Sequence, residues 1–167
     1  MDMDHLFEIE TPYPDLTDLT EDKTAIRLIA PQYAGCYGEL TAVLQYTYQK
    51  HVFEQLGDDE TARILEHISV VEMKHFDYLG EMILKLGALP IYSVLPPYPS
   101  RFYSARSVSY VASPERMILA DIAAEQEAIA SYTTIARQTK NEIVKNGLLR
   151  IVEDEKLHLK IFGTLLR

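Results

Sequence analysis

The stretch 70-VVEMKHFDYLG-80 decides the fold of this chain. It places Glu72 and His75 three positions apart, and residues at this spacing lie on one face of a helix, about 5 Å from each other. A helix that faces a core repeats its buried positions in steps of three and four. Apolar residues occupy those steps around the pair, at Leu65, Ile68, Leu79, Met82 and Leu86. An acid and an imidazole therefore stand inside a predicted buried seam.

Polar residues stand inside an apolar seam on three other segments as well. Glu155 and His158 repeat the Glu-x-x-His spacing, Glu125 stands alone in its seam, and Glu39 leads into a seam that Lys50 interrupts. The apolar neighbours at steps of three and four are Leu148, Ile151, Phe162 and Leu165 around Glu155 and His158, Ile118, Ile122 and Ile129 around Glu125, and Val43 and Phe53 after Glu39. The sequence therefore predicts four helices, each with at least one carboxylate facing a shared core.

Glu127 is the alternative to Glu125 on its segment. The two positions differ by about 200° around a helix axis, so only one of them can face the core. The isoleucine stripe at 118, 122 and 129 selects Glu125. Glu127 is expected to lie in solvent.

Four buried carboxylates and two imidazoles create a charge problem. Burying an unpaired carboxylate costs several kcal/mol, on the order of a whole domain's marginal stability when summed over four. Two divalent cations would balance the four negative charges. Histidine together with carboxylate suits iron or manganese better than calcium or magnesium, which prefer oxygen ligands alone. The predicted metal ligands are Glu39, Glu72, His75, Glu125, Glu155 and His158.

Four more side chains are predicted beside these ligands. Metal-binding histidines usually donate their second ring N–H to a carboxylate or a carbonyl, and Asp121 and Asp154 are the candidates for that role. Tyr46 follows Glu39 by seven positions, and Tyr132 follows Glu125 by the same interval. Each tyrosine is either a core residue with a tethered hydroxyl or a redox or oxygen-site residue.

The segment boundaries give the predicted connectivity. Residues 1–23 contain two prolines and several Asp and Thr residues, which is typical of an irregular arm. Residues 24–167 are predicted to form one bundle, and 90–113, rich in Pro, Ser and Tyr, are predicted to be a long crossover. The first expected helix spans about 24–56, with a break near Pro31 and Gly35 that can separate a short first helix. The second runs from about 58 or 59 to the stop signal at 85–90, the third from 114 to near 138–141, and the fourth from about 141 to the C-terminus. The predicted fold class is all-α, a four-helix bundle with a long crossover between helices 2 and 3.

Composition excludes several classes of function. The chain has 167 residues, a formal net charge of −9 and no basic patch, so no nucleic-acid partner is expected. No apolar run approaches the roughly 20 residues of a membrane helix, and the acidic first residues do not resemble a secretory signal. The single cysteine, Cys36, cannot form an internal disulfide or a CxxC knuckle. We expect a cytoplasmic protein with no membrane partner.

The motifs resemble the ferritin-like di-metal carboxylate superfamily over about residues 25–166. The segments 38-GELTAVLQYTYQ-49, 72-EMKHFDYLGEMILKLGALP-90 and 154-DEKLHLKIF-162 resemble bacterioferritin and rubrerythrin. The segments 25-AIRLIAPQYAGCYGEL-40, 109-SYVASPERMILADIAAE-125 and 127-EAIASY-132 are similar to manganese catalases and their spore-coat relatives. The resemblance implies a ferritin-like bundle, the same six metal ligands, and a homo-oligomer of two or more chains. In the manganese-catalase pattern, the residue matching Glu155 is an acid–base group near the metals and not a direct ligand.

The chain also departs from these relatives. It lacks the Cys-rich module that delivers electrons in rubrerythrin, so a peroxidase would need an external electron donor. Met73 matches the haem-binding methionine of bacterioferritin, but the Tyr-rich crossover does not match, and haem is not expected. Manganese catalases are longer and carry a C-terminal extension that this chain lacks.

The sequence predicts an oxidoreductase with two transition-metal ions, iron first and manganese second, acting on hydrogen peroxide or dioxygen. Peroxidase or ferroxidase chemistry suits iron, and catalase disproportionation suits manganese. Glu155, Tyr46 and Tyr132 are the candidate catalytic residues. A metal-storage or metal-handling protein is the first alternative, and a structural bundle without metal is the second.

Overall fold

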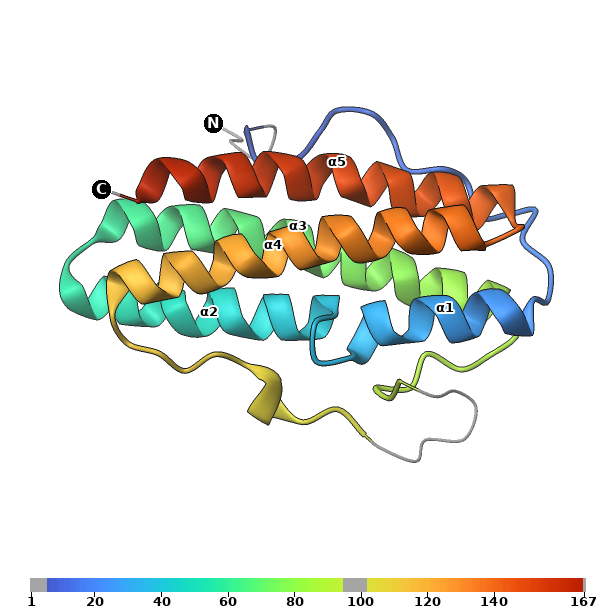
Figure 1. Ribbon diagram of the computed structural model, residues 1–167, viewed down its shortest axis with the longest axis horizontal. Helices are drawn as coiled ribbons and strands as arrows, with labels where there is room; N and C mark the ends of the chain where they lie inside the picture. Colours follow the sequence, from blue (N-terminus) through green and yellow to red (C-terminus); the bar gives the residue numbers. More distant parts are fainter. Residues whose placement is uncertain (1–5, 95–101, 167) are drawn as a thin grey trace.

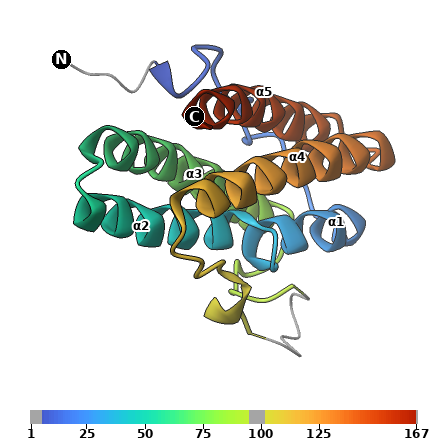
Figure 2. The same cartoon turned by 60° about the vertical axis from the view of Figure 1, so that its left-hand side comes forward.

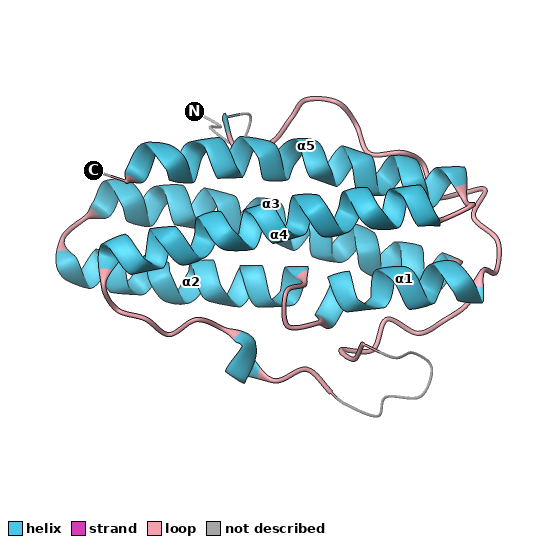
Figure 3. Cartoon of the chain, in the orientation of Figure 1, coloured by secondary structure: helices cyan, strands magenta, loops and turns pink. Residues whose placement is uncertain are grey.

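Five α-helices make up most of the computed structural model, which describes residues 6–94 and 102–166 (Figure 3). The connection between α3 and α4 contains one turn of 3₁₀ helix, η2, and an isolated antiparallel bridge between Ser93 and Phe102. The elements are α1 (Lys23–Ala34), α2 (Glu39–Leu56), α3 (Asp59–Lys85), η2 (Ala105–Ser107), α4 (Pro114–Gln138) and α5 (Glu142–Leu165).

The helices form a four-helix bundle with one interrupted member. Helices α1 and α2 lie end to end along one side, and α3, α4 and α5 form the other three (Figures 1 and 2). The pairs α2–α3 and α4–α5 pack most extensively. The described parts of the connection from α3 to α4, residues 86–94 and 102–113, lie outside α1 and α2 (Figure 1). The predicted fold class is therefore confirmed; residues 1–5 of the predicted arm and 95–101 of the predicted crossover lie outside the described ranges.

The break in the first long helix has a local cause. Pro31 lies inside α1 and has no N–H to donate, and the chain turns at Gly35, whose N–H donates to the Pro31 carbonyl at 2.8 Å. A Cβ atom at Gly35 would lie 2.2 Å from that carbonyl oxygen, and one at Gly38 would lie 2.5 Å from the Gln32 carbonyl oxygen. Both positions therefore require glycine. The turn makes Glu39 the first residue of α2, where the positive end of the helix dipole favours a carboxylate.

The other helix ends follow the capping signals in the sequence. Asp58 accepts a hydrogen bond from the Thr61 N–H and caps α3, and Pro114 occupies the first position of α4. Asn141 caps α5 by accepting from two backbone N–H groups. Lys50, which interrupts the apolar stripe of α2, lies at the edge of the helix pair, where its Nζ contacts Glu66 Oε1 of α3 at 2.7 Å.

The apolar core is divided into two clusters by a polar layer. One cluster joins α1 with the C-terminal end of α3 and the N-terminal part of α5, through residues such as Ile29, Leu79 and Leu148. The second lies at the opposite end of the bundle and includes Leu65 and Phe162. Glu72 and His75 lie in α3 between the residues that belong to the two clusters. The polar layer therefore occupies the middle of the bundle.

The N-terminal segment, residues 6–22, runs along α5 before it enters α1 (Figure 1). Leu16 and Leu19 are buried in the first apolar cluster. The Ile9 N–H donates to Asp154 of α5, and Arg150 of α5 donates to the Ile9 carbonyl. The predicted irregular arm is thus packed against the bundle over its described length.

Candidate metal centre

Six side chains with metal-ligand chemistry meet in the polar layer. Each of the four bundle members contributes, and every one of the six residues is at most 3% exposed. They are Glu39 from α2, Glu72 and His75 from α3, Glu125 from α4, and Glu155 and His158 from α5. These are the six ligands proposed from the sequence, and the structure brings all of them together. Glu127 is exposed, which agrees with the stripe argument that selected Glu125.

The six residues divide into two overlapping groups of four. In each group, one ligand atom per residue lies within 4.8 Å of the others. The first group is Glu39, Glu72, His75 and Glu155, and the second is Glu72, Glu125, Glu155 and His158. Glu72 and Glu155 belong to both groups. A carboxylate has two oxygens, so each of these two residues can serve two ions at once.

Each histidine directs Nδ1 toward the shared carboxylates. His75 Nδ1 lies 3.2 Å from Glu72 Oε2 and 3.5 Å from Glu155 Oε1. His158 Nδ1 lies 3.2 Å from Glu155 Oε2 and 2.9 Å from Glu72 Oε1. The last contact is short, and Glu72 Oε1 is buried and accepts no hydrogen bond from the described residues. A nitrogen and an oxygen that approach without sharing a proton suit a common positive ion, so the donor set fits a pair of metal ions.

Burial and neighbouring charges shift the pKa values of the clustered side chains. Burial, followed by the charge of neighbouring carboxylates, raises the pKa of Glu39 and of Glu125 well above the ordinary value. Burial also acts to lower the pKa of His75 and His158, but the surrounding carboxylates outweigh it and raise both pKa values. Burial acts to raise the pKa of Glu72, yet the two histidines hold it below the ordinary value. Ions that bind these groups would have to displace protons from them.

Tyr46 and Tyr132 hold the two outer carboxylates. The Tyr46 hydroxyl donates to Glu125 Oε1 at 2.6 Å, and the Tyr132 hydroxyl donates to Glu39 Oε1. The pairing crosses the bundle, because each tyrosine binds the glutamate of the other half of the chain. Burial, and then the adjacent carboxylates, raise the pKa of both phenols well above the ordinary value, so both remain donors.

The second ring nitrogens of the histidines point away from the cluster. His75 Nε2 lies 3.0 Å from Asp154 Oδ2, as the sequence argument expected for Asp154. His158 Nε2 lies 2.9 Å from the carbonyl oxygen of Phe7. Asp121 was also predicted to accept a hydrogen bond from a histidine, and this prediction is wrong. Its Oδ1 accepts hydrogen bonds from Gln45 and Gln49 at 2.8 Å each and from neither histidine.

The structure gives Asp121 a different environment because the side chains that donate to it come from α2. Burial raises the pKa of Asp121 to about 7, against the lowering effect of the two amide hydrogen bonds. Gln45 also accepts a hydrogen bond from the Ser109 N–H of the crossover at 3.0 Å. The sequence analysis did not select Gln45 and Gln49, although two amides four positions apart on one helix face were a visible signal.

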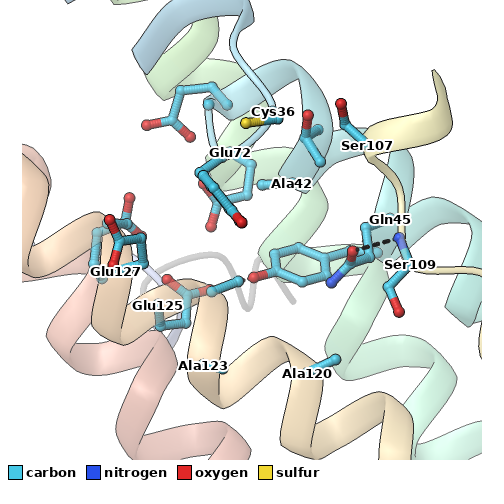
Figure 4. Close-up of a pocket in the computed structure, with 18 of the residues that line it drawn as sticks. Cys36, Ala42, Gln45, Glu72, Ser107, Ser109, Ala120, Ala123, Glu125 and Glu127 are labelled. Carbon is cyan, nitrogen blue, oxygen red and sulfur yellow. Dashed lines mark hydrogen bonds between the residues drawn. The ribbon is translucent and has the colours of Figure 1, made fainter. Parts of the chain in front are cut away.

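A cavity of about 550 Å³ reaches the cluster from the side of α2 and α4 (Figure 4). The buried carboxylates of Glu72 and Glu125 line it, together with small side chains such as Ala42 and Ala123. Its lining also includes the exposed residues Cys36, Tyr37 and Glu127. The polar layer is therefore connected to the surface on this side.

A family model described as the ferritin-like domain matches residues 37–167, which include all six clustered side chains. The chain belongs to the ferritin-like family. This ferritin-like chain is 25% identical to protein CotJC of Bacillus subtilis (strain 168), over 92% of its own length and 88% of that protein.

Solved structures show the same fold. The ferritin-like chain matches KatB, a manganese catalase from Anabaena, with a TM-score of 0.78 and 21% identity, over 96% of this chain and 78% of that one. It matches the bacterioferritin BfrA of Mycobacterium tuberculosis with a TM-score of 0.73 and 25% identity, over 88% and 86% of the two chains. In the ranges 6–94 and 102–166, no helix combines the length and the apolar composition needed to cross a membrane.

Proposed function

We propose that this protein is a di-metal oxidoreductase that acts on hydrogen peroxide or dioxygen. The observation that carries the proposal is that two four-residue groups share Glu72 and Glu155. Such sharing would let the four carboxylates hold two ions close together and balance their charge. His75 and His158 would each provide one imidazole, and this mixed donor set suits iron first and manganese second.

When bound, the two ions would supply the electrons exchanged with the oxidant. The chain supplies positions and protons. Glu155 lies between the two histidines and is proposed to bridge, as is Glu72. Glu39 and Glu125 are proposed as outer ligands, each oriented by the tyrosine that donates to it. Tyr132 binds Oε1 of Glu39 and leaves Oε2 3.8 Å from His75 Nδ1, whereas Oε1 of Glu125 both accepts from Tyr46 and lies 3.9 Å from His158 Nδ1.

The cavity between α2 and α4 is the proposed route for the oxidant. All four carboxylates of the cluster and both tyrosines line it, so an incoming molecule would reach the ligands directly. Reduction of hydrogen peroxide to two waters consumes two electrons and two protons. Burial raises the pKa of Tyr46 and Tyr132 well above the ordinary value, so two protonated phenols lie beside the route. A peroxidase of this design requires an external electron donor, and a catalase requires none.

Metal analysis of the full chain tests the proposal. The protein is produced with iron and manganese both supplied, and the metal content per chain is measured together with peroxide consumption, with and without a reductant. Two ions per chain and peroxide consumption are expected. Donor-dependent consumption with iron indicates a peroxidase, and oxygen release with manganese indicates a catalase. A chain that stays empty under every loading condition would overturn the proposal.

Light scattering separates this proposal from metal storage. Storage requires a large closed shell, whereas the oxidoreductase proposed here needs only a homo-oligomer of two or more chains. A dimer or a small ring that turns over peroxide supports the oxidoreductase. A shell that accumulates iron far beyond two ions per chain contradicts it.

A further inference from the structure

We propose that the N-terminal segment from Phe7 to Tyr13 positions the two histidines for metal binding. The inference rests on the proposed dinuclear site and assigns a role to a segment that contributes no ligand of its own. Both histidines present Nδ1 to the carboxylates and Nε2 to the outside of the cluster. On that outer side, the partners of both rings depend on this segment.

The contact to His158 is direct. The Phe7 carbonyl oxygen, 2.9 Å from Nε2, can only accept a hydrogen bond, so Nε2 must carry the proton. In the neutral ring, Nδ1 is then the nitrogen with a free electron pair, and it is the nitrogen that faces Glu72 and Glu155. The Phe7 ring is 7% exposed and stacks on His67 with centroids 4.9 Å apart, which fixes the carbonyl in place.

The contact to His75 passes through Asp154. That carboxylate accepts from the Ile9 N–H at 2.7 Å and from the Tyr13 hydroxyl at 2.8 Å, while its Oδ2 faces His75 Nε2. Two of its partners therefore come from a segment more than 140 positions away in the sequence. These two hydrogen bonds restrict rotation of the Asp154 carboxylate. Because Asp154 Oδ2 faces His75 Nε2, they also fix the orientation of the His75 ring.

Arg150 connects the segment to α5. Its Nη1 lies 2.6 Å from Asp154 Oδ2, its Nη2 donates to the Ile9 carbonyl at 2.6 Å, and its Nε donates to the Thr11 carbonyl. Its guanidinium also lies 4.4 Å from the centre of the Tyr13 ring. A lysine cannot make these contacts together, because its ammonium group has neither the planar shape nor the spread of donors. We therefore assign Arg150, Tyr13 and the backbone of Phe7 and Ile9 as positioning groups.

The test uses Arg150→Lys, which keeps the positive charge beside Asp154 and removes the planar guanidinium with its several N–H donors. The affinity for each of the two Co²⁺ ions is measured by competition with a chelator. Arg63→Lys is the control, because Arg63 is an exposed residue of α3 whose Nε also donates to a backbone carbonyl. Arg150→Lys is expected to weaken one Co²⁺ about tenfold or more and leave the second within about twofold. In Zn²⁺-loaded protein, the His75 Nε2–H proton signal should shift, while that of His158 should move less.

Tyr13→Phe is the second variant, with Tyr78→Phe as its control. Tyr78 donates to the carbonyl of Pro14, the residue that follows the segment, and has no hydrogen bond to Asp154. Tyr13→Phe is expected to weaken the same single ion as Arg150→Lys, and Tyr78→Phe is expected to weaken neither. Equal losses in both tyrosine variants would mean general loosening and would overturn the assignment to Asp154.

The outcomes separate this inference from the proposed function. Wild-type protein that binds two Co²⁺ ions and responds to Arg150→Lys, but never consumes peroxide with iron or manganese, leaves the inference standing and removes the oxidoreductase. Wild-type protein that consumes peroxide, with unchanged Co²⁺ affinities and unchanged His75 signal in Arg150→Lys and Tyr13→Phe, removes the inference and leaves the oxidoreductase.

Discussion

Replacing Glu72 by glutamine is expected to abolish most of the thermal stabilisation that metal gives to this protein. Glu72 belongs to both groups of clustered ligands, so its loss affects both ions. At a free metal concentration one hundred times the dissociation constant, each site adds about 2.7 kcal/mol to the free energy of unfolding. Two sites add roughly 5 kcal/mol. For a chain of 167 residues this corresponds to a rise in Tm of roughly 10–20 °C.

The assay compares Tm with excess Mn²⁺ and with chelator for each variant, so that any cost of the substitution itself cancels. His75→Gln removes a ligand from one group only and should keep about half of the metal-dependent rise, roughly 5–10 °C. Glu66→Gln, on the exposed face of the same helix, should keep all of it. A full rise in Glu72→Gln, or equal losses in Glu66→Gln and Glu72→Gln, would refute the shared-ligand reasoning.

Three further predictions follow from the same structure. Metal affinity should fall with pH, by about tenfold per pH unit for each proton released, because the raised pKa values of Glu39 and Glu125 mean that the ions must displace protons. Calorimetry in buffers of different ionisation enthalpy counts the released protons, and a metal affinity that does not change with pH would contradict the prediction. Tyr132→Phe should lower peroxide turnover about tenfold with two ions still bound, whereas Tyr110→Phe, exposed and outside the cavity lining, should have no effect in the same steady-state assay. Gly147→Ala should lower the free energy of unfolding, measured with urea, by about 1–3 kcal/mol, because its Cβ would lie 2.7 Å from the Tyr78 hydroxyl of α3. Gly163→Ala, with open space around it, should raise that free energy by up to about 1 kcal/mol. The reverse order would show that α3 and α5 are not in close contact at Gly147.

The positions of the clustered residues were visible in the sequence because a helix imposes a local period. Steps of three and four around Glu72 and Glu155 place each acid on the same face as its histidine and as the apolar residues beside it. Asp154, next to Glu155, could also be proposed from adjacency. Such arguments need no knowledge of how the helices pack, since every residue in them lies within one helix.

The partners of Asp121 could not be assigned in this way. Which helix faces one turn of α4 depends on the packing of the whole bundle, and the structure places Gln45 and Gln49 of α2 there. A sequence pattern could have indicated both amides as buried, because they are four positions apart beside Tyr46. It could not have matched them to a carboxylate more than 70 positions away.

The N-terminal segment shows the same limit more strongly. Its two prolines and acidic residues indicate irregular structure, and irregular structure has no period from which burial can be inferred. Arg150 and Asp154 lie four positions apart on α5, which predicts an ion pair, but nothing local predicts that both also bind the backbone of residues 9 and 11.

The sequence by itself determined the four seams, the acids and imidazoles within them, and the charge imbalance that calls for two cations, because periodicity and charge are properties of each segment alone. Only the tertiary structure decided which carboxylates are shared between the two groups, which tyrosine holds which glutamate, and which atoms orient the histidines. These are distances between segments distant in sequence, and they are set by the close packing of the bundle and by the path of the N-terminal segment along α5.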